Sequence, residues 1–263
     1  MNVMTFSGLL KDWRKQRGFS QLALSLEADI SSRHLSFLET GRARPSEAMV
    51  LRLADALRVP LRETNAFLNA AGYVGRYADG ALDRDELAEI RQALDLILNA
   101  HEPYPAFVVD RALNIVRAND GLGRFLAALG AAPAADGPPN IARAVLAPGP
   151  LREAIVNWDD VALALIARLK NEAWLEGPAS PRRALLDEVK GDPAVAALMA
   201  SGRPAVAGPI LAVELVLAGR ATAWFSTITT FGTPQDLAVA ELAIEQMHPA
   251  DTATAEAVAA LGG

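Results

Sequence analysis

The chain has 263 residues, of which 51% are hydrophobic and none is cysteine. This length and apolar share suit one large domain or two ordinary ones, and they exclude global disorder. The lack of cysteine excludes disulfides, zinc–thiolate sites, iron–sulfur clusters and a cysteine nucleophile. No secretory signal pattern and no apolar run of membrane-spanning length are present, so we expect a cytoplasmic protein without a membrane partner.

The formal net charge of -6 is unevenly distributed along the chain. Residues 1–72 hold ten Lys or Arg and seven Asp or Glu, which gives +3, and the remainder carries -9. Because phosphate contacts are made by basic side chains, this asymmetry is expected if only the first part of the chain meets phosphate groups.

Residues 1–72 are predicted to form an all-α domain of five short helices. Apolar residues at helical spacing predict the first from about Phe6 to Arg17, and Gly18 ends it. Ser46 can cap the fourth helix, and Pro60 suits the first turn of a fifth helix that ends before Gly72.

The second and third helices, separated by a tight break near Asp29 and Ile30, predict a helix-turn-helix. Ser20 and Ser31 can cap them, because a serine oxygen accepts a backbone N–H that the first turn leaves unsatisfied. Apolar side chains at helical spacing are expected to face one core: Leu22, Ala23, Leu26, Leu35 and Leu38. The free side of the third helix then carries side chains suited to base edges in a major groove: Ser31, Ser32, Arg33 and Ser36.

This region resembles the Cro/repressor-type (XRE) helix-turn-helix family through Gly18-Phe19-Ser20-Gln21, the Leu22/Ala23 pair, Leu38-Glu39-Thr40-Gly41 and Pro45. The resemblance implies that Gln21 contacts phosphate or braces the recognition helix. It also implies that Arg42 and Arg44 meet the DNA backbone, while base edges are faced by Ser31, Ser32, Arg33 and Ser36. Arg33 is the best candidate for direct readout. The alternative is a plain helical bundle with solvated arginines.

Residues 73–102 are predicted to be a linker and a connecting helix. A regular apolar stripe spans about residues 83–100 and contains Leu87, Ile90, Leu94, Ile97 and Leu98. This stripe packs either on the second domain or on the equivalent helix of a partner.

Residues 103–263 are predicted to mix strands and helices. Strands are expected at 105–109, 113–118, about 211–217 and about 224–231. Helices are expected at 120–129, 141–146, 151–174 and, as two short pieces, within 178–204, with a flexible connection at 130–140. Residues 237–247 favour helix by composition and strand by position. A last helix is expected from about Pro249 to Leu261.

A second resemblance, to the MmyB-type ligand-binding domain, covers about residues 100–255. It rests on Pro105–Asp110, Val116–Asn119, Phe231–Asp236 and Pro249–Asp251. It implies a PAS-like α+β domain with an antiparallel sheet flanked by helices, a strand at 237–247, and a small apolar ligand, with fatty acid the leading suggestion. Residues that would line a pocket, or simply form core, are Phe107, Val109, Phe125, Trp158, Trp224, Phe225 and Phe231. Arg117 or His248 would hold a carboxylate.

The sequence shows no catalytic constellation. Its three histidines are scattered, and neither a dinucleotide loop nor a phosphate loop is present, so no catalytic residue, metal ligand or cofactor is predicted. The best interpretation is a homodimeric transcriptional regulator that binds a double-stranded DNA operator and senses a small apolar ligand. Two alternatives remain: a constitutive repressor whose second domain only dimerises or binds protein, and an enzyme with a DNA-binding domain attached.

Overall fold

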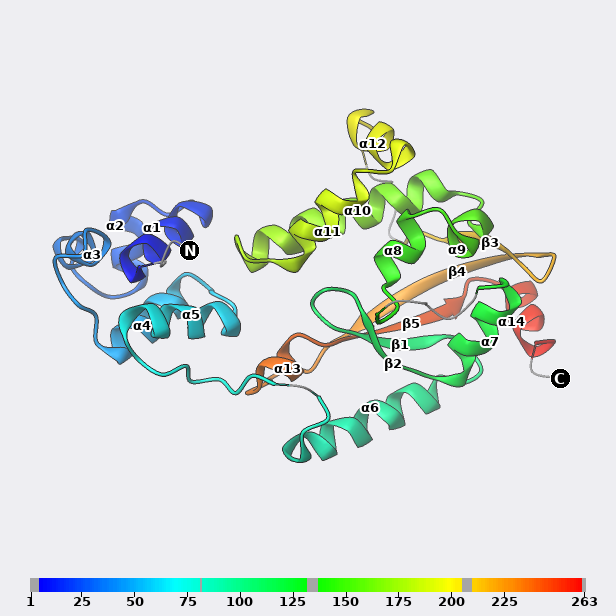
Figure 1. Cartoon of the computed structure of the whole chain (residues 1–263), viewed down its shortest axis with the longest axis horizontal. Coiled ribbons are helices and arrows are strands. Elements are labelled where there is room, and N and C mark those ends of the chain that lie inside the picture. The colour runs from blue at the N-terminus through cyan, green and yellow to red at the C-terminus, as the bar shows by residue number, and fades with distance from the viewer. Residues whose placement is uncertain (1–4, 81, 132–136, 205–209, 262–263) are drawn as a thin grey trace. The chain divides into compact units, whose positions relative to one another are not determined.

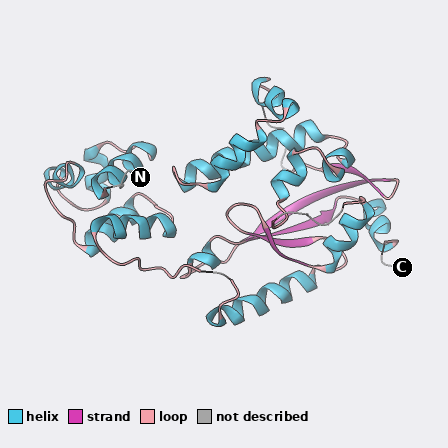
Figure 2. Cartoon of the chain, viewed as in Figure 1, coloured by secondary structure: helices cyan, strands magenta, loops and turns pink. Residues whose placement is uncertain are grey.

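The computed structural model describes residues 5–80, 82–131, 137–204 and 210–261, and its elements are shown in Figures 1 and 2. The chain divides into two compact units. The first comprises residues 1–80 with the short segments 175–179 and 234–240, and the second comprises the remainder. Among the described residues, no helix combines the length and apolar character needed to cross a bilayer.

The N-terminal region contains the five predicted helices, which are α1 (Phe6–Gln16), α2 (Gln21–Glu27), α3 (Ser32–Glu39), α4 (Glu47–Ala56) and α5 (Leu61–Ala71). The caps are those expected: Ser20 Oγ accepts from the Ala23 N–H at 3.0 Å and Ser31 Oγ from the His34 N–H at 3.1 Å. Gly72 follows α5 with φ 90°, a left-handed conformation that costs glycine little. The short capped pattern therefore predicts these helices well.

The core-facing side of α2 differs from the sequence expectation. Leu22 and Leu26 are 61% and 73% exposed and Ala23 is also exposed, whereas Leu24 and Ala28 are buried with Leu35 and Leu38. Apolar residues occur all around this short helix, so spacing alone does not identify the buried side. The assignment of Leu22, Ala23 and Leu26 to the core was wrong.

The second unit is built on one antiparallel sheet of five strands in the order β2-β1-β5-β4-β3. The strands are β1 (Ala106–Val109), β2 (Ile115–Ala118), β3 (Val213–Leu217), β4 (Arg220–Thr229) and β5 (Ala243–Pro249). The last strand pairs with both β1 and β4, so it lies at the centre of the sheet. The α+β class expected for this part of the chain is confirmed.

Helices cover both faces of this sheet (Figure 1). On one face lies α6 (Ala88–Ala100), preceded by a 3-10 turn at Asp85–Leu87. Leu94 and Leu98 of α6 pack against Ala106, Val108 and Ile244 of the sheet. The apolar stripe of this helix therefore packs on the sheet of its own chain, which is the first of the two predicted alternatives.

The other face carries the larger core. Alternation along β1 turns Phe107 and Val109 toward this side and Ala106 and Val108 toward α6. The helices of the second half are α7 (Asp120–Ala128), α8 (Ile141–Leu146), α9 (Pro150–Ala154), α10 (Trp158–Glu176), α11 (Pro181–Val189), α12 (Pro193–Ala200), α13 (Leu237–Ala240) and α14 (Thr252–Ala259). Part of the connection predicted at 130–140 lies outside the described residues.

Two helical expectations needed correction. The helix expected over 151–174 breaks between α9 and α10, because Ile155 turns extended and the Val156 N–H donates to the Glu214 carbonyl oxygen of β3 at 2.7 Å. Residues 237–247 combine both alternatives, with the short helix α13 followed by the central strand β5. The helix-favouring composition decides the structure of α13, which lies outside the sheet. Hydrogen bonding to β1 and β4 on both sides decides the structure of β5.

Candidate DNA-binding face and ligand cavity

The N-terminal half of α3 presents an exposed polar surface. The guanidinium carbon of Arg33 lies 5.4 Å from the centre of the Phe37 ring, within the range of a cation–π contact. This contact one turn along the helix limits the orientations of Arg33 while its side chain remains exposed. The arginine is thus partly preorganised on the outer side of α3.

The serines beside Arg33 differ in how their hydroxyls are used. Ser31 Oγ accepts the capping hydrogen bond and so keeps its proton to donate elsewhere. Ser32 Oγ lies 2.9 Å from Ser25 Oγ, which ties the start of α3 to the buried side of α2. Ser36 is half-buried, and its carbonyl oxygen accepts from Thr40 Oγ1 at 2.7 Å. Ser31 is therefore an exposed serine whose capping role leaves its hydroxyl proton unused.

The position of α3 depends on a buried ion pair at its last residue. Glu39 accepts from Arg14 Nη2 at 3.0 Å and from Gln21 Nε2 at 2.7 Å, and Arg14 Nη1 also donates to the Phe19 carbonyl oxygen at 2.8 Å. Burial alone would raise the pKa of Glu39, but the hydrogen bonds from Arg14 and Gln21 and the nearby positive charge bring it below the ordinary value. Gln21 thus hydrogen-bonds to the carboxylate at the end of α3, a contact of the kind that bracing this helix requires.

Sequence reasoning missed Arg14 and Glu39 as positioning residues, although a signal was present. Glu39 follows Leu35 by four residues and Arg14 follows Leu10 by four, so each polar residue falls on the apolar stripe of its own helix. A carboxylate and a guanidinium on two stripes that meet in one core predict a buried pair.

Arg42 and Arg44 lie in the loop after α3 and are exposed. Within the described ranges neither side chain has a hydrogen bond or an ion pair with the protein. Their guanidinium groups therefore remain available to an anion outside the chain.

The second unit contains a cavity of about 850 Å³ between the sheet and its covering helices. The walls are mainly apolar. They come from α7, α8, α9, α10, the chain before α8 and all five strands of the sheet. Phe107, Trp224 and Met247 line it from the sheet, and Phe125 meets the Trp224 ring edge-on with centroids 5.6 Å apart. This is the size and character of a site for a small organic molecule.

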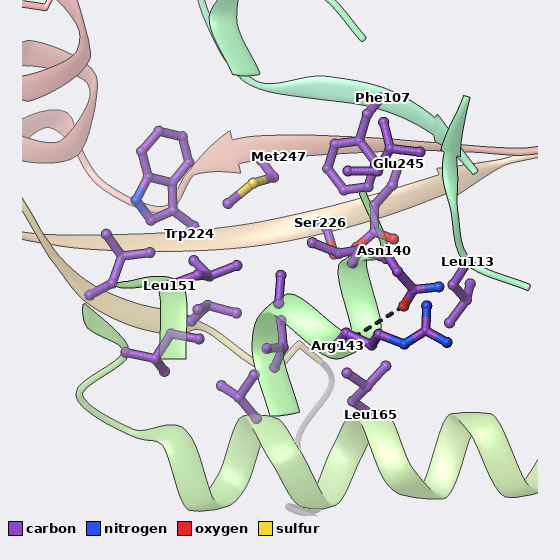
Figure 3. A pocket seen from close by; sticks show the side chains of 18 of the residues that line it. Phe107, Leu113, Asn140, Arg143, Leu151, Leu165, Trp224, Ser226, Glu245 and Met247 are labelled. Atoms are coloured by element: carbon purple, nitrogen blue, oxygen red, sulfur yellow. Dashed lines mark hydrogen bonds between the residues drawn. The ribbon is translucent and has the colours of Figure 1, made fainter. Parts of the chain in front are cut away.

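The few polar groups of the cavity gather at one end. Figure 3 shows Glu245, Ser226, Asn140 and Arg143 on one side of the view and Trp224 with Leu151 on the other. Arg168 of α10 also lines the cavity, and its Nη1 lies 3.6 Å from Glu245 Oε2. The cavity thus has a charged end and an apolar end.

Four of the expected pocket residues line the cavity: Phe107, Phe125, Trp224 and Phe225. The ring of Phe225, however, stacks on His248 with centroids 5.0 Å apart. Sequence reasoning missed the polar residues at the charged end, Arg168 and Glu245 among them.

The other five expected pocket residues lie outside the lining. Val109 is fully buried in the core, and Phe231 packs with the α6 cluster. Arg117 pairs with Asp95 of α6 at 2.8 Å, and the Trp158 Nε1–H donates to the Val145 carbonyl oxygen at 2.8 Å. His248 lies between Phe225 and His101. Neither Arg117 nor His248 is placed to hold a carboxylate in this cavity.

Comparison with known proteins finds two families, which match separate parts of the chain. Residues 10–63 match the model of a helix-turn-helix family, and residues 90–261 match that of the MmyB-like transcription regulator ligand binding domain. The chain is also similar to a solved structure, the PAS domain from Bordetella pertussis BvgS, at 14% identity and a TM-score of 0.29, over 66% of this chain and 95% of that one. No curated protein matches the chain.

Both family descriptions are regulatory, and together they describe a ligand-responsive, DNA-binding transcription regulator. The second match alone covers more than half of the 263 residues. The chain therefore belongs to the family that carries the MmyB-like transcription regulator ligand binding domain, behind an XRE-type helix-turn-helix.

Proposed function

We propose that this chain is a homodimeric regulator whose α3 helices read a DNA operator and whose cavity binds a small amphipathic molecule, with a fatty acid as first candidate. The observation that carries the ligand part is the apolar cavity of about 850 Å³ with polar groups at one end. An acyl chain suits the apolar walls, because each buried methylene contributes about 0.8 kcal/mol. The polar end suits a headgroup.

The DNA part of the proposal rests on the exposed side of α3. The candidate base-reading residues are Ser31, Ser32, Arg33 and Ser36, and the candidate backbone contacts are Arg42 and Arg44. Gln21 acts through Glu39, whose oxygen it contacts. In a dimer two such helices would enter half-sites ~34 Å apart. A ligand would regulate binding by favouring one arrangement of the two DNA-binding units over another.

Replacing Arg33 with alanine is expected to weaken binding to an operator duplex, selected from a random-sequence pool, by roughly 5- to 150-fold. This follows from about 1–3 kcal/mol for a bidentate arginine–guanine contact. Preference at a single base position should relax, because the contact is to one base edge. Fluorescence anisotropy with duplexes varied at each position measures both effects.

Arg44→Ala is the matched control for this experiment, because Arg44 is an exposed arginine in the loop beyond α3. It should weaken all duplexes alike and reduce the salt slope by about one. Unchanged affinity and specificity in Arg33→Ala would remove Arg33 from direct readout.

A further inference from the structure

A row of four alternating charges ends in the wall of the cavity, and we call it the charge ladder. Arg182 Nε of α11 lies 2.8 Å from Glu172 Oε2, and Glu172 Oε1 accepts from Arg168 Nε at 2.9 Å within α10. Arg168 Nη1 then lies 3.6 Å from Glu245 Oε2 of β5. The two end side chains are largely buried, with exposed fractions of 10% for Arg182 and 15% for Glu245.

The ladder is electrically neutral when all four groups are ionised. Arg168 already faces two carboxylates, so an anion entering the cavity beside it meets Glu245 as a like charge. Two carboxylates at one site do not both remain ionised without a large cost, and one of them takes up a proton. Arg143, the other cation of the lining, is held by Glu188 through contacts of 2.7 and 2.8 Å.

Glu245 is the carboxylate placed to take that proton. Arg168 and Glu172 face it from α10, with Arg182 behind Glu172, and its register partners in the sheet are the apolar residues Phe107 and Ile228. Burial raises the pKa of Glu245 above its ordinary value, although the charge of Arg168 and a hydrogen bond from Ser226 oppose the change. The charge of Glu172 adds to the increase.

We propose that the ligand of this cavity carries a carboxylate, which binds Arg168 while Glu245 becomes protonated, so that binding takes up one proton from solvent. The proton stays on Glu245, whose O–H donates to the ligand carboxylate. With Glu245 neutral the ladder carries +1, which the ligand's single negative charge balances. This inference rests on the proposed function, in which the cavity holds an amphipathic molecule with a fatty acid as first candidate, and it adds the proton that accompanies binding.

The test compares decanoate with decanol, which has the same chain length and no charge. Isothermal titration of the full chain between pH 6 and 10, in two buffers of different ionisation enthalpy, counts the protons taken up. A free carboxylic acid is ionised over this range. Decanoate should bind with proton uptake that rises toward one, and its Kd should increase up to tenfold per pH unit once Glu245 is ionised in the free protein. Decanol should show neither effect.

Glu245→Gln should abolish both the proton uptake and the pH dependence, and it should bind decanoate more tightly than the unmodified chain at pH 9. Glu214→Gln is the matched control, because Glu214 is an exposed carboxylate of the same sheet and lies outside the cavity lining. That variant should keep the proton uptake of the unmodified chain.

Tight decanoate binding without proton uptake at any pH would overturn the proposal and leave the proposed function standing. Binding of decanol but not decanoate would overturn it in the same way. If neither molecule bound, the proposed function would fail as well. The proton count on the unmodified chain does not depend on whether either variant folds.

Discussion

Arg14→Met is expected to unfold the helix-turn-helix, because it leaves Glu39 buried without its charge partner. The Glu39 side chain is 3% exposed and that of Arg14 is 12% exposed. Breaking a buried ion pair by removing one partner costs about 3–5 kcal/mol. A small domain has a total stability on the order of 5 kcal/mol, so most of it is lost. DNA binding should disappear with it.

Hydrogen exchange measured peptide by peptide localises this effect in the full chain. Peptides from α1–α5 should lose their protection in Arg14→Met, and those from the sheet should keep it. Lys15→Met is the matched control, since the neighbouring Lys15 is exposed, and it should leave exchange unchanged. The double variant Arg14→Met/Glu39→Leu should recover much of the protection, because no unpaired charge remains. Full protection of α1–α5 in Arg14→Met would show that the pair does not stabilise the fold.

The same pair gives the helix-turn-helix a predictable acid sensitivity. The pKa of Glu39 is lowered in the folded state, so its contribution to stability is complete above the ordinary carboxyl value of about 4.3. That contribution declines as the pH falls through the lowered pKa. In Glu39→Gln the free energy of unfolding should lack the part of its pH dependence that comes from this residue.

Ala164→Trp is expected to abolish ligand binding, with at least a hundredfold increase in the Kd for decanoate. Ala164 lines the cavity from α10, so the indole ring would occupy space that the acyl chain needs. Each methylene that the ligand fails to bury costs about 0.8 kcal/mol, and four lost methylenes already exceed a factor of about 100. Isothermal titration measures the Kd.

Ala167→Trp provides the matched control for this change, because Ala167 is exposed on the same helix and does not line the cavity. It should bind decanoate as the unmodified chain does. If Ala164→Trp bound decanoate with unchanged affinity, the acyl chain would have to lie somewhere else.

The fold of the N-terminal region was predictable because its signals are local. Ser20 and Ser31 cap helices and Gly72 ends one, and these effects depend on a few adjacent residues. The buried side of α2 was not predictable from spacing, because Leu22, Leu24 and Leu26 offer alternative apolar faces and only packing selects one.

The cavity was predictable only in part, for a related reason. Large aromatic residues such as Phe107 and Trp224 suggest a core or a pocket wherever they occur. Arg168 and Glu245 meet only because α10 packs over the sheet beside β5. The residues around each of them in the sequence do not mark either one as buried. Long-range packing therefore decided the polar end of the site.

The measurement that tests the account most directly is the Kd of the full chain for a selected operator duplex, determined with and without saturating decanoate. The account predicts at least a fivefold difference between the two values, which is the lower range of coupling free energies between sites. It also predicts no difference in Ala164→Trp. Equal operator affinities with the cavity empty and filled would contradict the claim that this ligand controls DNA binding.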